Sequence, residues 1–137
     1  TQIMELRKVY KPIHPTGHHQ RINFDTPYLK EPPHWMINIL PPEWISYMDD
    51  TLQFMNDNEL SSERWWGFND VEIEKFKRVT DYMRENPVNI DIINNGRRDF
   101  YTFFTEYDQR RNVNLLETFP AYEEFYYMCK SIHEDYK

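Results

Sequence analysis

A histidine-rich loop is the first part of the chain whose residues could do chemistry. Imidazole and carboxylate groups bind zinc and iron in proteins. The loop and the segment after it supply four such side chains: His14, His18, His19 and Asp25. Prolines and a glycine among the histidines disfavour the helix that would turn two rings to one side. We therefore expect a polar loop whose histidines face water or cap backbone groups. The alternative is a metal-binding protein or small metalloenzyme that uses these four residues.

Nucleophilic and acid–base chemistry find less support in the sequence. Cys129 lies on the apolar face of the last expected helix, where a free cysteine is usually a small core residue. A reactive thiolate needs electropositive, partly exposed surroundings. The neighbouring pairs Glu123–Glu124 and Glu134–Asp135 are typical of a solvated helix face. We assign no catalytic residue and no cofactor, which favours a non-catalytic domain over an enzyme.

Other residues could hold a partner without transforming it. Adjacent Trp65 and Trp66 cannot both face one core, so one of them is expected to be exposed or to pack on the first region of the chain. The candidate contact surface comprises His34, Trp35, Arg64, Trp65, Trp66, Arg97 and Arg98. The alternatives are a hydrophobic plug between helices for the two tryptophans, and simple solvation for Arg97 and Arg98.

The elements that must position these groups fall into two regions of a single domain over 1–137. Residues 1–41 hold 6 of the 9 prolines, which predicts extended chain and loops there. Alternating apolar residues predict a strand over 3–10. The run WMINIL predicts a buried strand over 35–40, with a buried helical turn as the alternative. Residues 42–137 predict helices with short links. The expected class is therefore α+β, predominantly helical, with about four helices and two or more short strands in the first 40 residues.

Apolar residues at helical spacing define the expected helices. The first begins near Pro41–Pro42, and the second is capped by Asn69 or Asp70 and stops at Asn86–Pro87. The third follows a predicted turn at Asn95–Gly96, and the last is capped by Thr118. Their expected buried stripes are Ile45, Met48, Leu52 and Met55; Ile73, Phe76, Val79 and Met83; Phe100, Phe103, Phe104 and Tyr107; and Tyr122, Phe125, Tyr126, Cys129 and Ile132.

Composition narrows the possible partners. The 137 residues include 23 acidic and 16 basic side chains, a formal net charge of -7. The pI of about 5.2 removes the basic field on which nucleic-acid binding relies. We find no run that predicts a transmembrane helix or a signal peptide. A single cysteine favours a reducing compartment. We therefore expect a cytoplasmic protein whose partner is another protein or a second copy of the chain.

The segment FFTEYDQRRNVNLLETFP, from Phe103 to Pro120, resembles the closing segment of radical SAM proteins with a twitch-type C-terminal extension. The similarity rests on Asp108, Arg111 and Asn112, followed by Thr-Phe-Pro. Upstream, EPPHWMINILPPEW is similar to the segment that closes the partial barrel of such proteins, and DYMRENP lies at a compatible distance. From the residues themselves, we expect Asp108 and Arg111 to pair on one helix face, Asn112 to end that helix, and Asn114 to cap a short turn.

The chain departs from that family in its cysteines. A radical SAM enzyme holds its iron–sulfur cluster with three closely spaced thiolates, and this sequence has one cysteine. The resemblance therefore implies the C-terminal portion without the catalytic core, as a split product or a fragment, and transfers no active-site residue. The expected function is a non-catalytic accessory or interaction domain. An orphan or virus-encoded protein is a further alternative, which rests on the abundance of Asn, Ile, Tyr and Phe.

Overall fold

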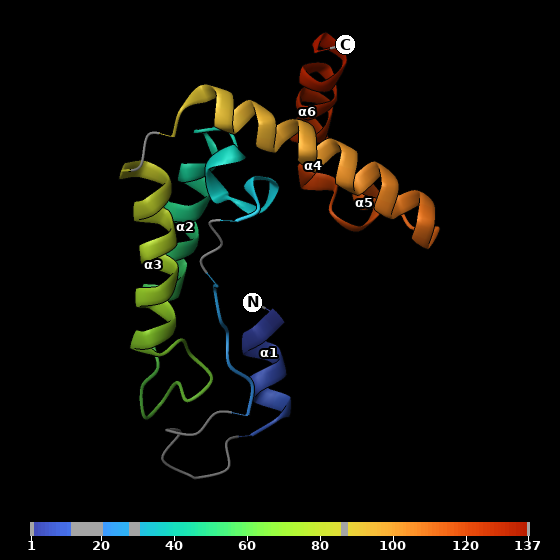
Figure 1. The fold of residues 1–137 in the computed structure, drawn as a ribbon. Coiled ribbons are helices and arrows are strands. Elements are labelled where there is room, and N and C mark those ends of the chain that lie inside the picture. The colour runs from blue at the N-terminus through green and yellow to red at the C-terminus, as the bar shows by residue number, and fades with distance from the viewer. Residues whose placement is uncertain (1, 12–20, 28–30, 86–87, 137) are drawn as a thin grey trace. The chain divides into compact units, whose positions relative to one another are not determined.

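The computed structural model describes residues 2–11, 21–27, 31–85 and 88–136. Within them the chain folds into α-helices and short 3-10 helices (Figure 1). The chain forms two compact units. Unit 1 comprises Thr1–Tyr28 and Glu43–Glu85, and unit 2 comprises Leu29–Pro42 and Asn86–Lys137. The predicted regions 1–41 and 42–137 do not coincide with these units, because each unit takes residues from both regions.

The predicted α+β class is wrong, since no β-strand forms in the part of the chain that the structure describes. The described β pairing is one isolated bridge between Glu59 and Phe68. Unit 1 instead contains helices α1 (Gln2–Val9), α2 (Trp44–Asp57) and α3 (Asp70–Glu85). Helices α2 and α3 pack against each other, and Figure 1 shows them side by side.

The segment predicted as a strand over 3–10 forms α1. Met4 and Arg7 are both buried, and a spacing of three residues is a helical repeat. Leu6 and Tyr10, which alternation would place inside with Met4, are 46% and 54% exposed. Alternation fails as a guide here because it places the charged Arg7 on the solvent side, whereas Arg7 is 1% exposed.

Arg7 joins three segments of unit 1. Its guanidinium donates from Nε to the carbonyl oxygen of Ile22 (3.0 Å) and from Nη1 to that of Gly67 (2.6 Å). From Nη2 it donates to the carboxylate of Glu72. Both charged side chains are almost fully buried, so each depends on the other for compensation.

Glu72 also fixes the start of α3. Its carboxylate accepts from the backbone nitrogens of Phe24 (2.7 Å) and Asn69 (3.0 Å). The Asn69 side chain in turn accepts from the backbone nitrogen of Glu72 (3.0 Å), which completes a reciprocal capping box. The cap that the sequence predicts at Asn69 or Asp70 is therefore Asn69. Around this polar centre, Met4, Met55 and Phe68 form the buried core of unit 1.

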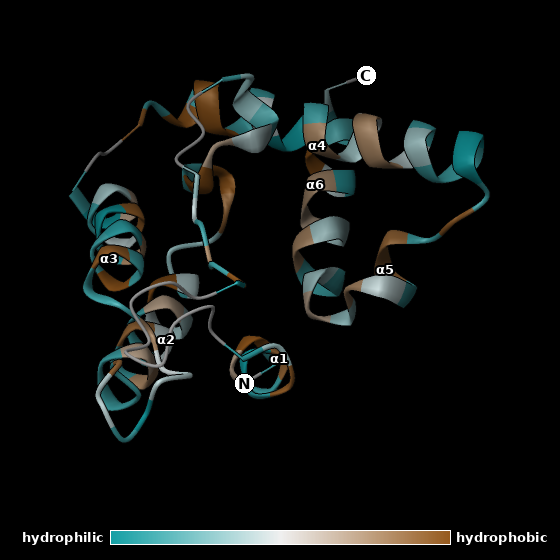
Figure 2. Ribbon diagram, turned by 90° about the horizontal axis from the view of Figure 1, so that it is seen from below, coloured by the Kyte–Doolittle hydropathy of each residue, from teal (hydrophilic) through white to brown (hydrophobic). Residues whose placement is uncertain are grey.

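Unit 2 is built around a long helix. Its elements are η1 (Pro33–Trp35), η2 (Ile37–Ile39), α4 (Ile90–Arg111), α5 (Leu115–Thr118), η3 (Pro120–Tyr122) and α6 (Glu123–Asp135). Helix α4 packs against η1, η2 and α6. Both hydrophobic and hydrophilic residues occur along α3 and α4, as expected of helices that are buried on one side (Figure 2). The buried core consists of Ile39, Phe100, Leu115, Phe125 and Cys129.

The predicted strand over 35–40 is wrong, and the helical alternative is right. Backbone hydrogen bonds run over three residues, from Met36 to Pro33 and from Leu40 to Ile37, each 3.1 Å long. These bonds close the 3-10 helices η1 and η2 locally. Buried apolar residues therefore satisfy their backbone without a neighbouring strand.

The predicted turn at Asn95–Gly96 lies inside α4. The helix begins earlier than expected because the Asn89 side chain accepts from the backbone nitrogen of Asp91 (2.8 Å) and caps it. Gly96 is buried where η1 and η2 cross the helix. A Cβ atom there would lie 2.7 Å from Ile39 Cγ2 and 2.9 Å from the Pro33 carbonyl oxygen. Gly96 thus allows close packing rather than a turn.

The sequence predicts the corner after α4 correctly in part. Asn112 adopts a left-handed conformation (φ 53°) and ends α4, and the Asn114 side chain caps α5, as predicted. Thr118 does not cap the last helix, because it lies in α5 and donates to the Asn114 carbonyl oxygen (3.2 Å). Asp108 is used differently from the predicted pair with Arg111: its Oδ2 accepts from the backbone nitrogen of Leu115 (2.8 Å).

Candidate binding groove

Of the four predicted metal ligands, the structure describes Asp25 alone. His14, His18 and His19 lie outside the described residues. The exposed Asp25 accepts from Lys75 Nζ over 2.7 Å. This hydrogen bond and the charge of Lys75 lower the pKa of the Asp25 carboxyl group. Within the described ranges, no three His, Cys, Asp or Glu side chains gather as a metal site would require.

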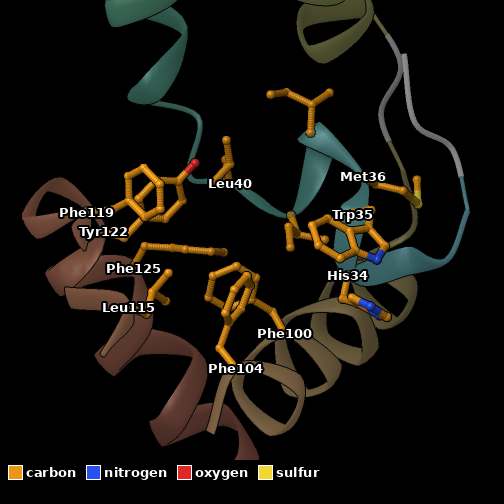
Figure 3. A pocket seen from close by; sticks show the side chains of 12 residues that line it. His34, Trp35, Met36, Leu40, Phe100, Phe104, Leu115, Phe119, Tyr122 and Phe125 are labelled. Carbon is orange, nitrogen blue, oxygen red and sulfur yellow. The ribbon is translucent and has the colours of Figure 1, made fainter. Parts of the chain in front are cut away.

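An apolar groove in unit 2 is the candidate functional site. It has a volume of about 260 Å³. Figure 3 shows the rings of Phe100 and Phe104 lying between the η1 side chains on one side and residues of α5, η3 and α6 on the other. The groove is lined by His34, Trp35, Met36, Ile37, Ile39, Leu40, Phe100, Phe104, Leu115, Phe119, Tyr122 and Phe125.

The first wall of the groove is formed by His34 and Trp35 of η1, which pack on aromatic residues of α4. The His34 ring stacks on Phe103, with ring centroids 5.2 Å apart. Trp35 meets Phe103 and Phe104 edge to face at 5.5 and 6.3 Å. Such offset and edge-to-face pairs are favoured over face-to-face stacking. Trp35 is therefore fixed in orientation although 43% of its surface remains exposed.

Closely packed rings of Phe100, Phe104 and Phe125 form the floor of the groove. The Phe100 centroid lies 4.7 Å from that of Phe104 and 4.9 Å from that of Phe125, which joins α4 to α6. Beneath these rings, burial raises the pKa of the Cys129 thiol to about 12. Cys129 is a buried core residue, as the sequence predicts, and its thiol is protonated at neutral pH.

The second wall of the groove is formed by Leu115, Phe119 and Tyr122, which lie at the corner between α4 and α6. Asn114 caps α5, and Asp108 holds the Leu115 backbone nitrogen, so Leu115 turns into the core. Phe119 follows α5 and is 54% exposed while it lines the groove. Burial raises the pKa of the Tyr122 phenol, so that group is protonated at neutral pH.

The predicted contact residues divide between the two units. His34 and Trp35 lie together in the groove of unit 2. In the same unit Arg97 donates from Nε to the Ile39 carbonyl oxygen (2.8 Å), and Arg98 lies 4.0 Å from the centroid of the Tyr136 ring. Both arginines are thus engaged within the unit.

Arg64, Trp65 and Trp66 belong to unit 1. Arg64 donates to the Asp57 carbonyl oxygen (2.5 Å). The two indole rings meet edge to face at 5.5 Å, and Trp66 packs against the core of unit 1. Both tryptophans are partly buried, which is closer to the predicted hydrophobic plug than to an open platform.

Sequence reasoning did not find most of the groove. Their spacing predicts Phe100, Phe104 and Phe125 as buried residues of helices, and no sequence pattern predicts Phe119 as a site residue. An apolar residue directly before a proline at a helix corner is the pattern that could have pointed to Phe119.

Comparison with known proteins finds no relative of the chain. No family model, no curated protein and no solved structure matches the chain. The resemblance to the C-terminal portion of twitch-type radical SAM proteins therefore stays a prediction. In the described part of the chain, no helix combines the length and the apolar character needed to cross a membrane.

Proposed function

We propose that the chain is a non-catalytic interaction domain that holds an apolar side chain of a protein partner in the groove of unit 2. The observation that carries the proposal is the pair Trp35 and Phe119. Both line the groove, and they are 43% and 54% exposed. A large aromatic ring left half in water loses that exposure when a partner covers it, and aromatic residues are enriched at the centres of protein interfaces.

The chemistry of the groove supports binding rather than catalysis. Most of its lining is carbon, from aromatic and aliphatic side chains. Burial raises the pKa of the Tyr122 phenol further above neutrality, so this group carries no charge in the groove at neutral pH. A hollow of this size suits one or two apolar side chains. Burying a residue of the size of leucine or phenylalanine contributes about 1.5–3 kcal/mol.

Selection from a random peptide library displayed on phage tests the proposal. Enriched peptides should share an apolar or aromatic residue, and their affinities can be measured by fluorescence polarisation. Trp35→Ala and Phe119→Ala should each weaken binding at least tenfold. Each substitution removes apolar surface whose burial contributes more than about 1.4 kcal/mol, and about 1.4 kcal/mol corresponds to a tenfold change in affinity. Circular dichroism checks that both variants remain folded.

Tyr47→Ala is the matched control. Tyr47 is an aromatic residue of unit 1 that is 67% exposed and does not line the groove, so its removal should leave peptide affinity unchanged. Selected peptides that bind equally well to the wild type and to both groove variants would contradict the proposed function.

A further inference from the structure

Carboxylates flank the second wall of the groove. Residues 117–124 read Glu-Thr-Phe-Pro-Ala-Tyr-Glu-Glu, so the groove-lining Phe119 and Tyr122 lie between Glu117 on one side and Glu123 and Glu124 on the other. All three glutamates are exposed. None of them forms an ion pair with a basic side chain in the described part of the chain. Their charges therefore remain available to a partner.

Three arginines of α4 are engaged by groups other than these glutamates. Arg97 and Arg98 contact the Ile39 carbonyl group and the Tyr136 ring, and Arg110 pairs with Glu106 over 2.9 Å. The wall thus presents negative charge beside an apolar hollow.

Helix geometry favours a carboxylate at each of these positions but does not neutralise its charge. Glu123 and Glu124 lie in the first turn of α6, where the partial positive charge of a helix N-terminus favours carboxylates. Glu117 lies in the first turn of the four-residue α5, where its backbone nitrogen donates to the Asn114 side chain (3.2 Å). The groove with its exposed rings and the exposed negative charge beside it are separate observations, and together they point to a ligand that is apolar and positively charged.

We propose that the groove takes an apolar anchor from a basic segment of a protein partner, with lysine or arginine residues on either side of the anchor. This inference rests on the proposed function and specifies the chemistry of the partner. The anchor fills the hollow between Trp35 and Phe119. The flanking cations face Glu117, Glu123 and Glu124. Opposite charges at the rim of an interface speed encounter and select among partners with similar anchors.

Three synthetic peptides test the inference. Each has a central Leu-Trp-Leu anchor, flanked at both ends by lysines, by glutamines or by glutamates. Fluorescence polarisation should show the lysine peptide binding roughly tenfold more tightly than the glutamine peptide, and the glutamate peptide binding most weakly. The advantage of the lysine peptide should shrink as salt is added, because exposed charges are screened.

Charge variants locate the effect. Replacing Glu117, Glu123 and Glu124 together by glutamine should abolish most of the advantage of the lysine peptide and leave the affinity of the glutamine peptide nearly unchanged. The matched control removes three exposed carboxylates of unit 2 outside the groove lining, through Asp91→Asn, Glu134→Gln and Asp135→Asn. Under the proposal, this control keeps the preference for lysine. Equal loss in both variants would mean that net charge acts, and would overturn the inference.

Two further outcomes separate the inference from the function on which it rests. Peptides that depend on Trp35 and Phe119 but bind equally with any flank would overturn the basic partner and leave the interaction domain standing. Peptides whose affinity does not change in Trp35→Ala or Phe119→Ala would contradict the proposed interaction domain itself. Sedimentation that shows a dimer dispersed by Phe119→Ala would identify a second copy as the occupant, and would also overturn the inference.

Discussion

Gly96 of α4 lies so close to Ile39 of η2 that a Cβ atom on the glycine would be 2.7 Å from Ile39 Cγ2. The same Cβ atom would be 2.9 Å from the Pro33 carbonyl oxygen. Since the second neighbour belongs to the backbone, rotation of a side chain cannot remove both clashes. The close approach brings η1 and η2 onto α4 and so positions the first wall of the groove.

Gly96→Ala should therefore destabilise unit 2. Helix propensity alone would favour alanine by about 1 kcal/mol, whereas overpacking a filled site costs about 1–3 kcal/mol. Since the clash involves backbone as well as side chain, we expect the overpacking cost to exceed the propensity gain, with a net loss of up to about 2 kcal/mol in the free energy of unfolding, measured by urea denaturation. The adjacent exposed Asn95 is the control, because Asn95→Ala gains propensity without a clash and should be neutral or stabilising. A Gly96→Ala protein as stable as the wild type would contradict the packing argument.

Arg7→Met should destabilise unit 1 by about 3–5 kcal/mol, because it leaves the buried Glu72 carboxylate without its counter-charge. Adding Glu72→Gln should recover part of that loss, since the amide keeps an acceptor oxygen for the Asn69 backbone but carries no charge. Urea denaturation followed by tryptophan fluorescence measures both effects.

Lys8→Met is the control for this pair. Lys8 lies beside Arg7 on α1, but its ion pair with Glu5 (2.8 Å) is exposed. Exposed pairs contribute about 0–1 kcal/mol, so this variant should lose little stability. Similar losses for Lys8→Met and Arg7→Met would show that burial of the Arg7–Glu72 pair does not matter.

The thiol of Cys129 should make unfolding easier at high pH. Below pH 9 the thiol is protonated in both the folded and the unfolded chain, because its pKa is about 12 in the fold against a usual 9.0. Between these values only the unfolded chain loses the proton, so the free energy of unfolding falls as pH rises. Comparison with Cys129→Ala across this range isolates the effect from the titration of tyrosine and lysine.

Reactivity offers an independent check on the same thiol. In the folded protein at pH 8, an aromatic disulfide reagent should label Cys129 far more slowly than in urea. Rapid labelling without denaturant would contradict a buried, protonated thiol.

The sequence predicts local structure well where the residues within one element determine its conformation. Phe100, Phe103 and Phe104 recur at helical spacing and lie in α4, and Asn112 and Asn114 end and begin helices because of their own side-chain and backbone preferences. These features depend on residues within a turn or two of one another.

The wrong predictions concern features that depend on distant residues. Arg7 faces the interior of unit 1 because it pairs with Glu72, which lies 65 positions away in the sequence. When that partner is unknown, the sequence of α1 has the alternating pattern of a strand. The predicted turn at Gly96 is wrong because the glycine is required by the backbone of Pro33, which lies in a distant part of the chain. The sequence does not reveal the groove for the same reason, since Trp35 and Phe119 line one groove only in the folded unit.

Asp108→Ala should weaken both unit 2 and its groove. The Asp108 carboxylate accepts from the Leu115 backbone nitrogen (2.8 Å), and a partly buried donor left without an acceptor costs about 1–3 kcal/mol. We expect a loss of about 1–2 kcal/mol in the free energy of unfolding. Affinity for apolar peptides should also fall, because α5 positions Leu115 and leads into Phe119.

Two further variants show whether the acceptor oxygen is responsible. Asp108→Asn should restore stability and peptide affinity, because the amide oxygen can accept the same bond without the charge. Glu106→Ala is the control: it breaks an exposed pair with Arg110 on the same helix, worth about 0.3–0.5 kcal/mol, and should leave the groove unaffected. If Asp108→Asn proves as weak as Asp108→Ala, the negative charge rather than the hydrogen bond holds this corner, and the account given for the second wall fails.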